Sequence, residues 1–289
     1  MDLGFEGATA VVTGGSKGMG LAIAESLAAE GASVAIMARG QATLDSAARQ
    51  IRAAGAPEVL TISVDMSDAD SIESAFASIG HAWNTLNVLV HTVGPNAGAF
   101  EDLDDDDWRS AFDLGTLSAV RSVRAALPLL RSAEWARIVT LSAHSIQRQS
   151  PRLVAYTAAK SALASFTMNL SKSLGAERIL VNCVCPGTIV TASFTEILRD
   201  VLAVDGLDAS DPEHVMRWVE KTYGHPCDIG RAGLPEEIAS VTTYLASRRN
   251  GYVTGATVNV DGGWNGAMTM GRHRAQWAEN PEEALPTKN

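Results

Sequence analysis

Short apolar segments rich in Val, Ile and Leu alternate with longer segments of helical periodicity, and this alternation restricts the fold more than any other feature of the sequence. Such continuous apolar segments are typical of strands buried on both faces, and helices between them provide the crossovers of parallel strands. We therefore predict an α/β fold with a doubly wound, seven-stranded parallel sheet. The expected strands lie at residues 8–12, 33–37, 59–64, 86–91, 137–142, 180–184 and 256–260. The expected helices lie at residues 21–30, 42–53, 71–83, 108–130, 154–174 and 236–245.

One domain, residues 1–263, accounts for this alternation, and two segments depart from it. Residues 191–230 follow the sixth expected strand and have an acidic, turn-prone middle, so we expect them to form a substrate lid at the carboxyl end of the sheet. Residues 264–289 form a C-terminal tail that becomes polar, and we expect it to pack on a neighbouring subunit or to fray.

Composition excludes several classes of partner. Hydrophobic residues make up 46% of the chain and the net charge is −10, so we expect a globular protein that does not bind nucleic acid. Three cysteines are too few for a disulfide framework or a four-ligand zinc site, and we expect no metal. With no targeting or membrane-spanning segment in the sequence, we expect a cytoplasmic protein without membrane contact.

A glycine-rich segment, TGGSKGMG at residues 13–20, follows the first expected strand and opens the next expected helix. Gly14, Gly18 and Gly20 permit a tight turn and close approach of the backbone to a pyrophosphate, which N–H groups at the helix N-terminus would bind. In this strand–loop–helix context the pattern predicts a dinucleotide-binding, Rossmann-type domain.

The end of the second expected strand discriminates between the two nicotinamide dinucleotides. An acidic residue there would bind the adenosine ribose, but Arg39 follows the strand and no acid occurs before Asp45. Arg39, together with Lys17 of the glycine-rich segment, would instead bind a 2′-phosphate by charge-assisted hydrogen bonds. We expect NADP(H) as the preferred cofactor and retain NAD(H) as the alternative.

Tyr156 and Lys160 are four residues apart in an expected helix, and this spacing places the phenol and the ammonium on one helix face. A free tyrosine has a pKa of about 10, and a nearby cation stabilises the phenolate and lowers that pKa. The pair therefore predicts a general acid/base, Tyr156, whose pKa is tuned by Lys160.

Together these motifs resemble the classical short-chain dehydrogenase/reductase family, over about residues 5–263. The resemblance rests on TGxxxGxG at 13–20, YxxxK at 156–160, VNxVxPGxxxT at 181–191 and the last strand with its turn at 253–263. It implies an oxidoreductase that interconverts a small-molecule carbonyl and an alcohol. Tyr156 would donate a proton to the carbonyl oxygen as hydride leaves the nicotinamide, and Lys160 would bind the nicotinamide ribose.

The resemblance also implies a set of cofactor contacts. Asp65, followed by Met66, would hold the adenine, and the segment after the sixth strand would hold the nicotinamide end. The complete expected set is Thr13, Gly14, Ser16, Lys17, Gly18, Met19, Gly20, Arg39, Asp65, Met66, His91, Gly94, Tyr156, Lys160, Pro186, Gly187, Ile189 and Thr191.

The chain departs from the family at the serine that orients the substrate, thirteen residues before the tyrosine, where it has Ala143. If the chain stays extended, strand alternation directs Ser145 toward the substrate, whereas a one-residue bulge would deliver Ser142. Both are candidate catalytic residues. A third interpretation is that both bond only to nearby backbone, and His144 is a further candidate donor.

Two further departures concern the proton relay and the fourth strand. The family's asparagine, counted from Trp108, falls at Gly115, so the relay would need another polar group or a water in the vacated space. The family's NNAG is His91-Thr-Val-Gly94 here, and His91 is either a core histidine or a functional one. These losses motivate an alternative hypothesis, a cofactor-binding protein of this fold with little or no redox activity. The retained Tyr156 and Lys160 argue against it.

Substrate polarity and assembly are inferred more coarsely. We predict a moderately apolar substrate from Phe194, Met216, Trp218 and Tyr223, with contributions from Val93, Pro95 and Phe100. The family resemblance implies a homodimer or homotetramer joined by an apolar helix face, comprising Leu117, Val120, Val123, Leu127 and Leu130. The acidic residues 101–107 indicate a charged first turn of that helix rather than a calcium site.

Overall fold

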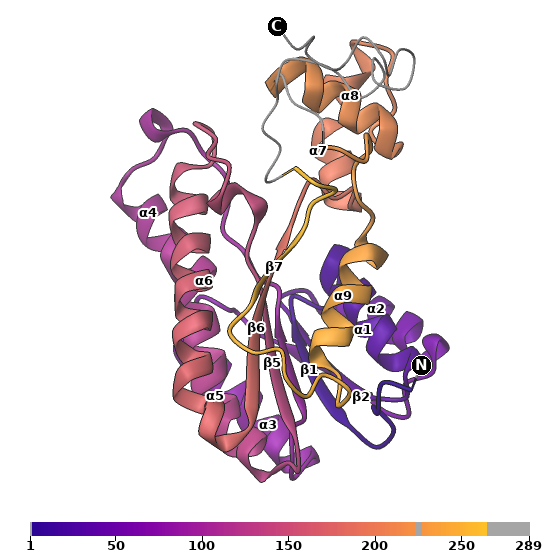
Figure 1. The fold of residues 1–289 in the computed structure, drawn as a ribbon, viewed down its shortest axis with the longest axis vertical. Helices are drawn as coiled ribbons and strands as arrows, with labels where there is room; N and C mark the ends of the chain where they lie inside the picture. The colour runs from indigo at the N-terminus through magenta and orange to yellow at the C-terminus, as the bar shows by residue number, and fades with distance from the viewer. Residues whose placement is uncertain (1, 224–226, 265–289) are drawn as a thin grey trace, which may run out of the picture.

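A computed structural model describes residues 2–223 and 227–264 of the chain (Figure 1). Seven strands form one parallel sheet in the order β3-β2-β1-β4-β5-β6-β7, which confirms the predicted fold class. The strand order reverses between β1 and β4, and ligands of such sheets bind at the carboxyl ends of the strands near this reversal. The strands are β1 (Thr9–Thr13), β2 (Ser33–Ala38), β3 (Val59–Ser63), β4 (Val88–His91), β5 (Ala136–Leu141), β6 (Ile179–Pro186) and β7 (Thr257–Val260).

Helices cover both faces of the sheet. In Figure 1, α1, α2 and α9 lie on one side of the strands and α3, α5 and α6 lie on the other. The helices are α1 (Gly18–Ala29), α2 (Gln41–Ala54), α3 (Ala69–Ala82), α4 (Asp105–Phe112), α5 (Ser118–Ser132), α6 (Val154–Leu174), α7 (Ala192–Ala203), α8 (Pro212–Tyr223) and α9 (Pro235–Ala246). Short 3₁₀ turns occupy Phe100–Asp102, His144–Ile146 and Gly175–Glu177.

Two apolar cores follow from the alternation of side chains along the strands. On β2, Val34 and Ile36 belong to the core beneath α1, α2 and α9, whereas Ala35 and Met37 belong to the core beneath α3 and α5. All four side chains are completely buried, because each face of the strand is covered by helices.

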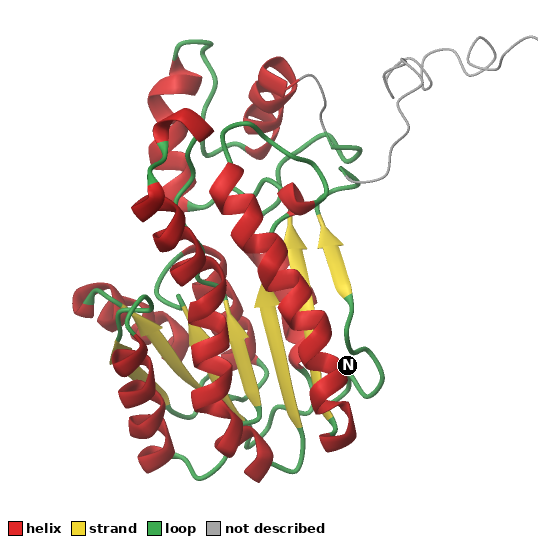
Figure 2. Cartoon of the chain, turned by 90° about the vertical axis from the view of Figure 1, so that its left-hand side faces the viewer, coloured by secondary structure: helices red, strands yellow, loops and turns green. Residues whose placement is uncertain are grey.

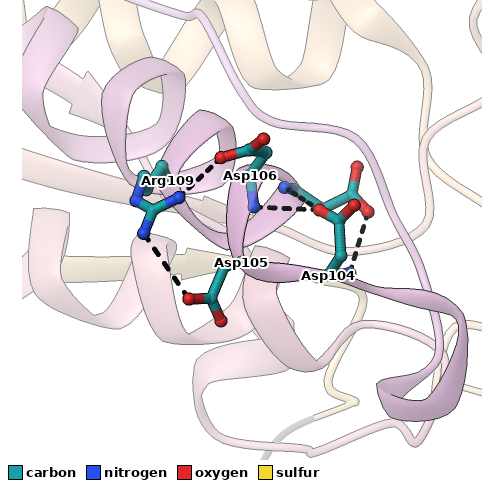
Figure 3. Close-up of polar contacts among 5 residues, drawn as sticks. Asp104, Asp105, Asp106 and Arg109 are labelled. Carbon is teal, nitrogen blue, oxygen red and sulfur yellow. Dashed lines mark hydrogen bonds and ion pairs between the residues drawn. The ribbon is translucent and has the colours of Figure 1, made fainter.

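The helix expected at 108–130 is divided and begins earlier. A π-helical turn, Asp113–Leu117, separates α4 from α5. The Asp104 carboxylate accepts hydrogen bonds from the N–H groups of Asp106 and Asp107, each 2.9 Å long, so α4 begins at Asp105 (Figure 3). The acidic segment therefore satisfies the free N–H groups of a helix start, and Arg109 forms ion pairs with Asp105 and Asp106.

The face proposed for subunit contacts is also divided. Val123 and Leu130 are buried in this chain's own core, whereas Leu117 is 41% exposed. This chain's own core therefore takes up only part of the predicted apolar face, because Val120 and Leu127 remain half-buried.

The segment expected to form the lid contains α7 and α8, which lie beyond the carboxyl ends of the strands (Figures 1 and 2). The two helices pack on each other through a small core of their own that includes Leu198, Leu202, Val215 and Val219. The expected tail lies outside the described residues from 265 onward.

No helix within the described residues is long and apolar enough to cross a membrane. Cys183, Cys185 and Cys227 are free and buried. In the described part of the chain no group of three or more His, Cys, Asp or Glu side chains is arranged to hold a metal ion.

Candidate active site

The glycine-rich loop connects β1 to α1 at the carboxyl edge of the sheet. The Gly14 N–H donates a 2.8 Å hydrogen bond to the Met37 carbonyl at the end of β2, and Lys17 is the N-cap residue of α1. A Cβ atom on Gly20 would overlap the Gly14 carbonyl, so only glycine permits this close turn. The free N–H groups of the α1 N-terminus are therefore exposed to an anion without an intervening side chain.

The loop after β6 meets the glycine-rich loop. A Cβ on Gly18 would lie 3.3 Å from Thr191 Cγ2, so the two loops are in near contact. Thr191 is the N-cap of α7 and accepts a 3.2 Å hydrogen bond from the Phe194 N–H. The Gly187 N–H donates to the Val260 carbonyl, which fixes this loop to β7. Residues expected at the two ends of a dinucleotide thus share one edge of the sheet.

Arg39 and Lys17 are both exposed, and neither forms an ion pair within the described residues. Asp65 accepts hydrogen bonds from the backbone N–H and the hydroxyl of Ser67, at 2.9 and 2.7 Å. These bonds, with a smaller contribution from the charge of Arg39, lower the pKa of Asp65. Arg39 therefore lies close enough to Asp65 to affect it, while its guanidinium remains available to a ligand.

Several residues of the expected cofactor set are enclosed. The side chains of Thr13 and His91 are completely buried, and those of Met66 and Pro186 are buried as well. At these positions a ligand would therefore be expected to meet the backbone rather than the side chain.

His91 is a satisfied core histidine. Its Nε2 is 3.0 Å from Ser118 Oγ, whose own proton goes to the Leu114 carbonyl, so Nε2–H is the donor. Its Nδ1 then accepts from the Thr13 hydroxyl at 3.0 Å. Burial, with the charge of Lys160, lowers the pKa of His91 to about 3, and the ring is neutral. This histidine joins β1, β4 and the start of α5.

Tyr156 and Lys160 occupy the first turns of α6, next to Gly94. A Cβ on Gly94 would lie 3.2 Å from Lys160 Cε and 3.9 Å from Tyr156 Cε2, so the two side chains share the space beside this glycine. Lys160 is 2% exposed and its Nζ donates to the carbonyls of Val93 and Leu141, at 2.9 and 2.7 Å. The sequence-predicted pair is therefore brought together, with the lysine held by the ends of β4 and β5.

The pKa values of this pair differ from expectation. Burial raises the pKa of Tyr156 to about 12, with a further contribution from Cys185, and burial lowers the pKa of Lys160 to about 8. The expected lowering of the tyrosine pKa by the lysine is not found, because the ammonium is directed to two carbonyls and desolvation dominates. Tyr156 is therefore a protonated donor at neutral pH.

The two candidate serines have different positions. Ser142 donates a 2.8 Å hydrogen bond to the Lys160 carbonyl and is buried between β5 and α6. After Ala143 the chain turns into a 3₁₀ helix instead of staying extended, and Ser145 reaches a large cavity. Ser145 Oγ accepts a 3.0 Å hydrogen bond from the Thr157 hydroxyl. Its own proton therefore remains available for a substrate oxygen.

The chain around Gly115 is tightly packed and leaves no free space beside this residue. A Cβ there would lie 2.7 Å from Ala159 Cβ and 3.1 Å from Pro95 Cδ. The expectation of space for a water in place of the family's asparagine side chain is therefore wrong at this position. The contact lets the π-helical turn approach α6, and Thr116 Oγ1 donates to the Ala159 carbonyl at 2.8 Å.

A cavity of about 730 Å³ lies between the 3₁₀ turn, the β6 loop and the lid helices. This volume lies within the range typical of small-molecule sites. Met19, Ile189 and Thr191 line its cofactor side, and Phe194 and Trp218 line it from the lid. Tyr156 itself is not among the lining residues, although its neighbour Thr157 holds Ser145 in the cavity wall.

Other residues expected to contact the substrate lie elsewhere. Met216 is 2% exposed and belongs to the lid core, while Phe100 is 69% exposed on the surface. Val93 and Pro95 do not line the cavity, and the Tyr223 side chain lies outside the described residues. Of the side chains predicted to contact the substrate, only Phe194 and Trp218 therefore line the cavity.

His144, Arg148 and Trp264 complete the wall, and of these the sequence suggested a role only for His144, as a candidate donor. His144 Nδ1 donates to the Pro186 carbonyl at 3.1 Å, so the ring is not the free donor that the sequence suggested. Burial lowers the pKa of His144, and its ring stacks on Trp264 with centroids 5.0 Å apart. In the sequence, only the i, i+4 spacing of His144 and Arg148 indicates that the two side chains lie near each other. Their contact with Trp264 depends on tertiary structure and could not be predicted.

Comparison with known proteins identifies the family. A family model described as enoyl-(acyl carrier protein) reductase matches residues 14–265. A 3-oxoacyl-[acyl-carrier-protein] reductase of Chlamydia trachomatis is 32% identical over 256 residues, which cover 88% of this chain and 96% of that protein. Dehydrogenase/reductase SDR family member 4 of Caenorhabditis elegans is 30% identical over 261 residues, covering 90% and 95%.

Solved structures agree. L-sorbose reductase from Gluconobacter frateurii, complexed with NADPH and L-sorbose, superposes with a TM-score of 0.85 at 28% identity, covering 93% of this chain and all of that one. A mutant actinorhodin polyketide ketoreductase with NADPH gives 0.79 at 27% identity, covering 90% and 98%. This chain belongs to the short-chain dehydrogenase/reductase family. It is an oxidoreductase of CH–OH and C=O groups that uses a nicotinamide cofactor.

Proposed function

We propose that the protein is an NADP(H)-dependent oxidoreductase that interconverts a small-molecule carbonyl and its alcohol, with reduction as the favoured direction. The observation that carries this proposal is a half-buried Tyr156 beside the buried Lys160, at the sheet edge that also holds the glycine-rich loop. A phenol that keeps its proton at neutral pH is suited to donate it to a carbonyl oxygen as negative charge develops there.

The residues fit a phosphorylated dinucleotide. The close turn at Gly20 leaves the α1 N-terminus open to a pyrophosphate, and Lys17 and Arg39 supply cations where an acid would select NAD(H). When bound, the nicotinamide supplies the hydride. Asp65 keeps a second carboxylate oxygen for the adenine amino group, and the loop from Gly187 to Thr191 lies where the nicotinamide end is expected.

We assign distinct roles to three side chains. Tyr156 protonates the substrate oxygen, and Ser145 donates a hydrogen bond that orients this oxygen, in place of the missing serine at Ala143. Lys160, with a pKa of about 8, is the neighbouring group that gives up a proton near neutral pH and so resupplies the site. Ser142 supports the lysine through its carbonyl and does not contact the substrate.

The test is oxidation of NADPH and, separately, NADH by the purified protein over a panel of ketones, aldehydes and quinones. We expect turnover with NADPH and a lower kcat/KM with NADH. Saturable NADPH binding without turnover on the whole panel would instead favour the cofactor-binding protein. A preference for NADH would contradict the roles of Lys17 and Arg39.

We also propose that the protein assembles as a homodimer or homotetramer. Leu117 and Met168 are 41% and 42% exposed, and exposed apolar side chains on neighbouring elements are suited to a partner surface. Light scattering coupled to gel filtration should give a mass of two or four chains, and a monomer would contradict the proposal.

A further inference from the structure

One wall of the large cavity is cationic. Arg148 and Arg152 line it from the segment between the 3₁₀ turn at His144–Ile146 and α6. No Asp or Glu is found among the described lining residues, although the whole chain has a net charge of −10. Two cations without an acid in a cavity wall are suited to an anionic ligand.

Arg148 is held in place by aromatic and backbone contacts rather than by a carboxylate. Its Nη1 donates to the Trp264 carbonyl at 3.1 Å, and the guanidinium carbon lies 5.8 Å from the centre of the Trp264 ring. His144 stacks on the same ring. Within the described residues Nε and Nη2 of Arg148 have no acceptor. The N–H groups on these two atoms therefore remain available to donate hydrogen bonds to a ligand.

Arg152 has no side-chain hydrogen bond or ion pair in the described part of the chain, and it is exposed at the cavity mouth. Its backbone N–H donates to Ser150 Oγ, which fixes the turn that carries it. Arg131 and Arg231, by contrast, are paired with Glu177 and Glu237. The contrast indicates that the cavity wall keeps its positive charge.

We propose that Arg148 and Arg152 bind an anionic group, a carboxylate or a phosphate, at the end of the substrate remote from the reacting carbonyl. The opposite wall is apolar, with Phe194, Trp218 and Ile189, so the substrate has an apolar body and an anionic end. This assignment rests on the proposed function, because it names the substrate class of the same site. It also adds an anionic end to the moderately apolar substrate predicted from the sequence.

The first experiment compares a series of methyl-ketone carboxylic acids of increasing chain length with their methyl esters and with the corresponding ketone phosphates. Steady-state reduction with NADPH is measured for the wild type, for Arg148→Gln with Arg152→Gln, and for the control Arg49→Gln on the exposed face of α2. We expect the wild type to prefer an anionic ketone over its ester. The double variant should lose about tenfold or more of kcat/KM for the anion, mainly through KM, and change little for the ester. Whichever anion shows the larger loss identifies a carboxylate or a phosphate as the ligand group.

The second experiment measures binding of the same compounds to the NADPH complex by calorimetry, which separates failure of this inference from failure of the proposed function. Arginine-dependent binding of the anion without turnover would support the anion site and contradict the reductase. Equal use of acid and ester, absence of anion binding, or equal losses for both substrates in the double variant would overturn the inference. Weakened NADPH binding in the double variant would overturn it too, because the arginines would then serve the cofactor.

Discussion

Burial gives Tyr156 and Lys160 the proton affinities that the proposed chemistry needs. The pKa of Tyr156, about 12, keeps the phenol protonated at neutral pH, and the pKa of Lys160, about 8, lies close to neutral pH. Both shifts have the same physical cause, because an environment of low polarity disfavours the charged form of each group. In the proposed reduction Tyr156 serves as the acid, because its phenol carries a proton before the substrate binds.

The two serines can be separated by substitution. Ser145→Ala removes the free hydroxyl of the cavity wall, and we expect kcat/KM to fall by roughly tenfold to a hundredfold. Ser142→Ala removes a buried hydrogen bond to the Lys160 carbonyl, and we expect it to lower the free energy of unfolding by about 1 kcal/mol with a smaller kinetic effect. Kinetics and urea unfolding on both variants check this, and the reverse pattern would return the role to Ser142.

Lys160 should make stability depend on pH in a defined direction. Its folded pKa of about 8 lies below the ordinary value of 10.5, so the unfolded chain binds more protons between these values. The buried ammonium therefore destabilises the folded protein to its full extent below pH 8, and this destabilisation decreases as the pH rises toward 10.5. Relative to Lys160→Met, the wild type should gain up to roughly 3 kcal/mol over this range. Urea unfolding of both proteins across the range measures this, and a constant difference would contradict it.

Local spacing made the Tyr156–Lys160 pair predictable from the sequence, because four residues on one helix fix a shared face. The choice between Ser142 and Ser145 was not predictable, since it depends on where β5 ends and the 3₁₀ turn begins. The role of His91 could not be predicted from the sequence either. Its partners Thr13 and Ser118 are 78 and 27 residues away along the chain, and only the sheet and the packing of the start of α5 bring them together.

At the scale of elements, the π-helical turn packs against α6, the helix that carries Tyr156 and Lys160. Gly115→Asn would restore the family's residue, but its Cβ would lie 2.7 Å from Ala159 Cβ. We expect a loss of about 1 to 3 kcal/mol of stability from overpacking, and lower rather than higher activity. Gly175→Asn is the control, because nothing lies within 4 Å of a Cβ there. Thermal unfolding of both variants tests this, and an unchanged Gly115→Asn protein would show that space exists.

The start of α4 gives a prediction of its own. Hydrogen bonds from the Asp107 and Asp106 N–H groups lower the pKa of Asp104 below its ordinary 3.8. The charged cap thus contributes stability at neutral pH that is lost as the pH falls through the folded pKa. We expect the melting temperature to fall for Asp104→Ala and less for Asp104→Asn, which keeps an acceptor. The difference between wild type and Asp104→Asn should vanish in acid, and its persistence there would contradict a role for the charge.

The strands and most helices were predictable because burial on both faces leaves a strong pattern in the sequence. The division of the expected helix at 108–130 was not, because apolar residues continue across the break. The π-helical turn at this break contains Gly115, which packs against Ala159 of α6, and such a contact leaves no periodic signal in the sequence. The lid helices were also left without assignment, because their apolar residues pack on each other rather than on the sheet.

For the whole molecule, the proposed preference for NADP(H) depends on how charge is distributed. A chain of net charge −10 repels a phosphorylated cofactor, so the exposed Lys17 and Arg39 must attract it locally. We expect Arg39→Ala, combined with Lys17→Ala, to raise KM for NADPH about tenfold or more and to leave KM for NADH nearly unchanged. Steady-state kinetics with both cofactors measures this. A parallel loss for both would mean that the cations serve the shared part of the dinucleotide.

The most direct test of the account is the turnover of Tyr156→Phe with NADPH and a ketone that the wild type reduces, with NADPH affinity measured alongside. The account predicts that kcat falls roughly a hundredfold to ten-thousandfold while NADPH affinity is retained, because the phenol proton is lost and the fold is not. Turnover within a few-fold of the wild type would contradict the assignment of Tyr156 as the proton donor.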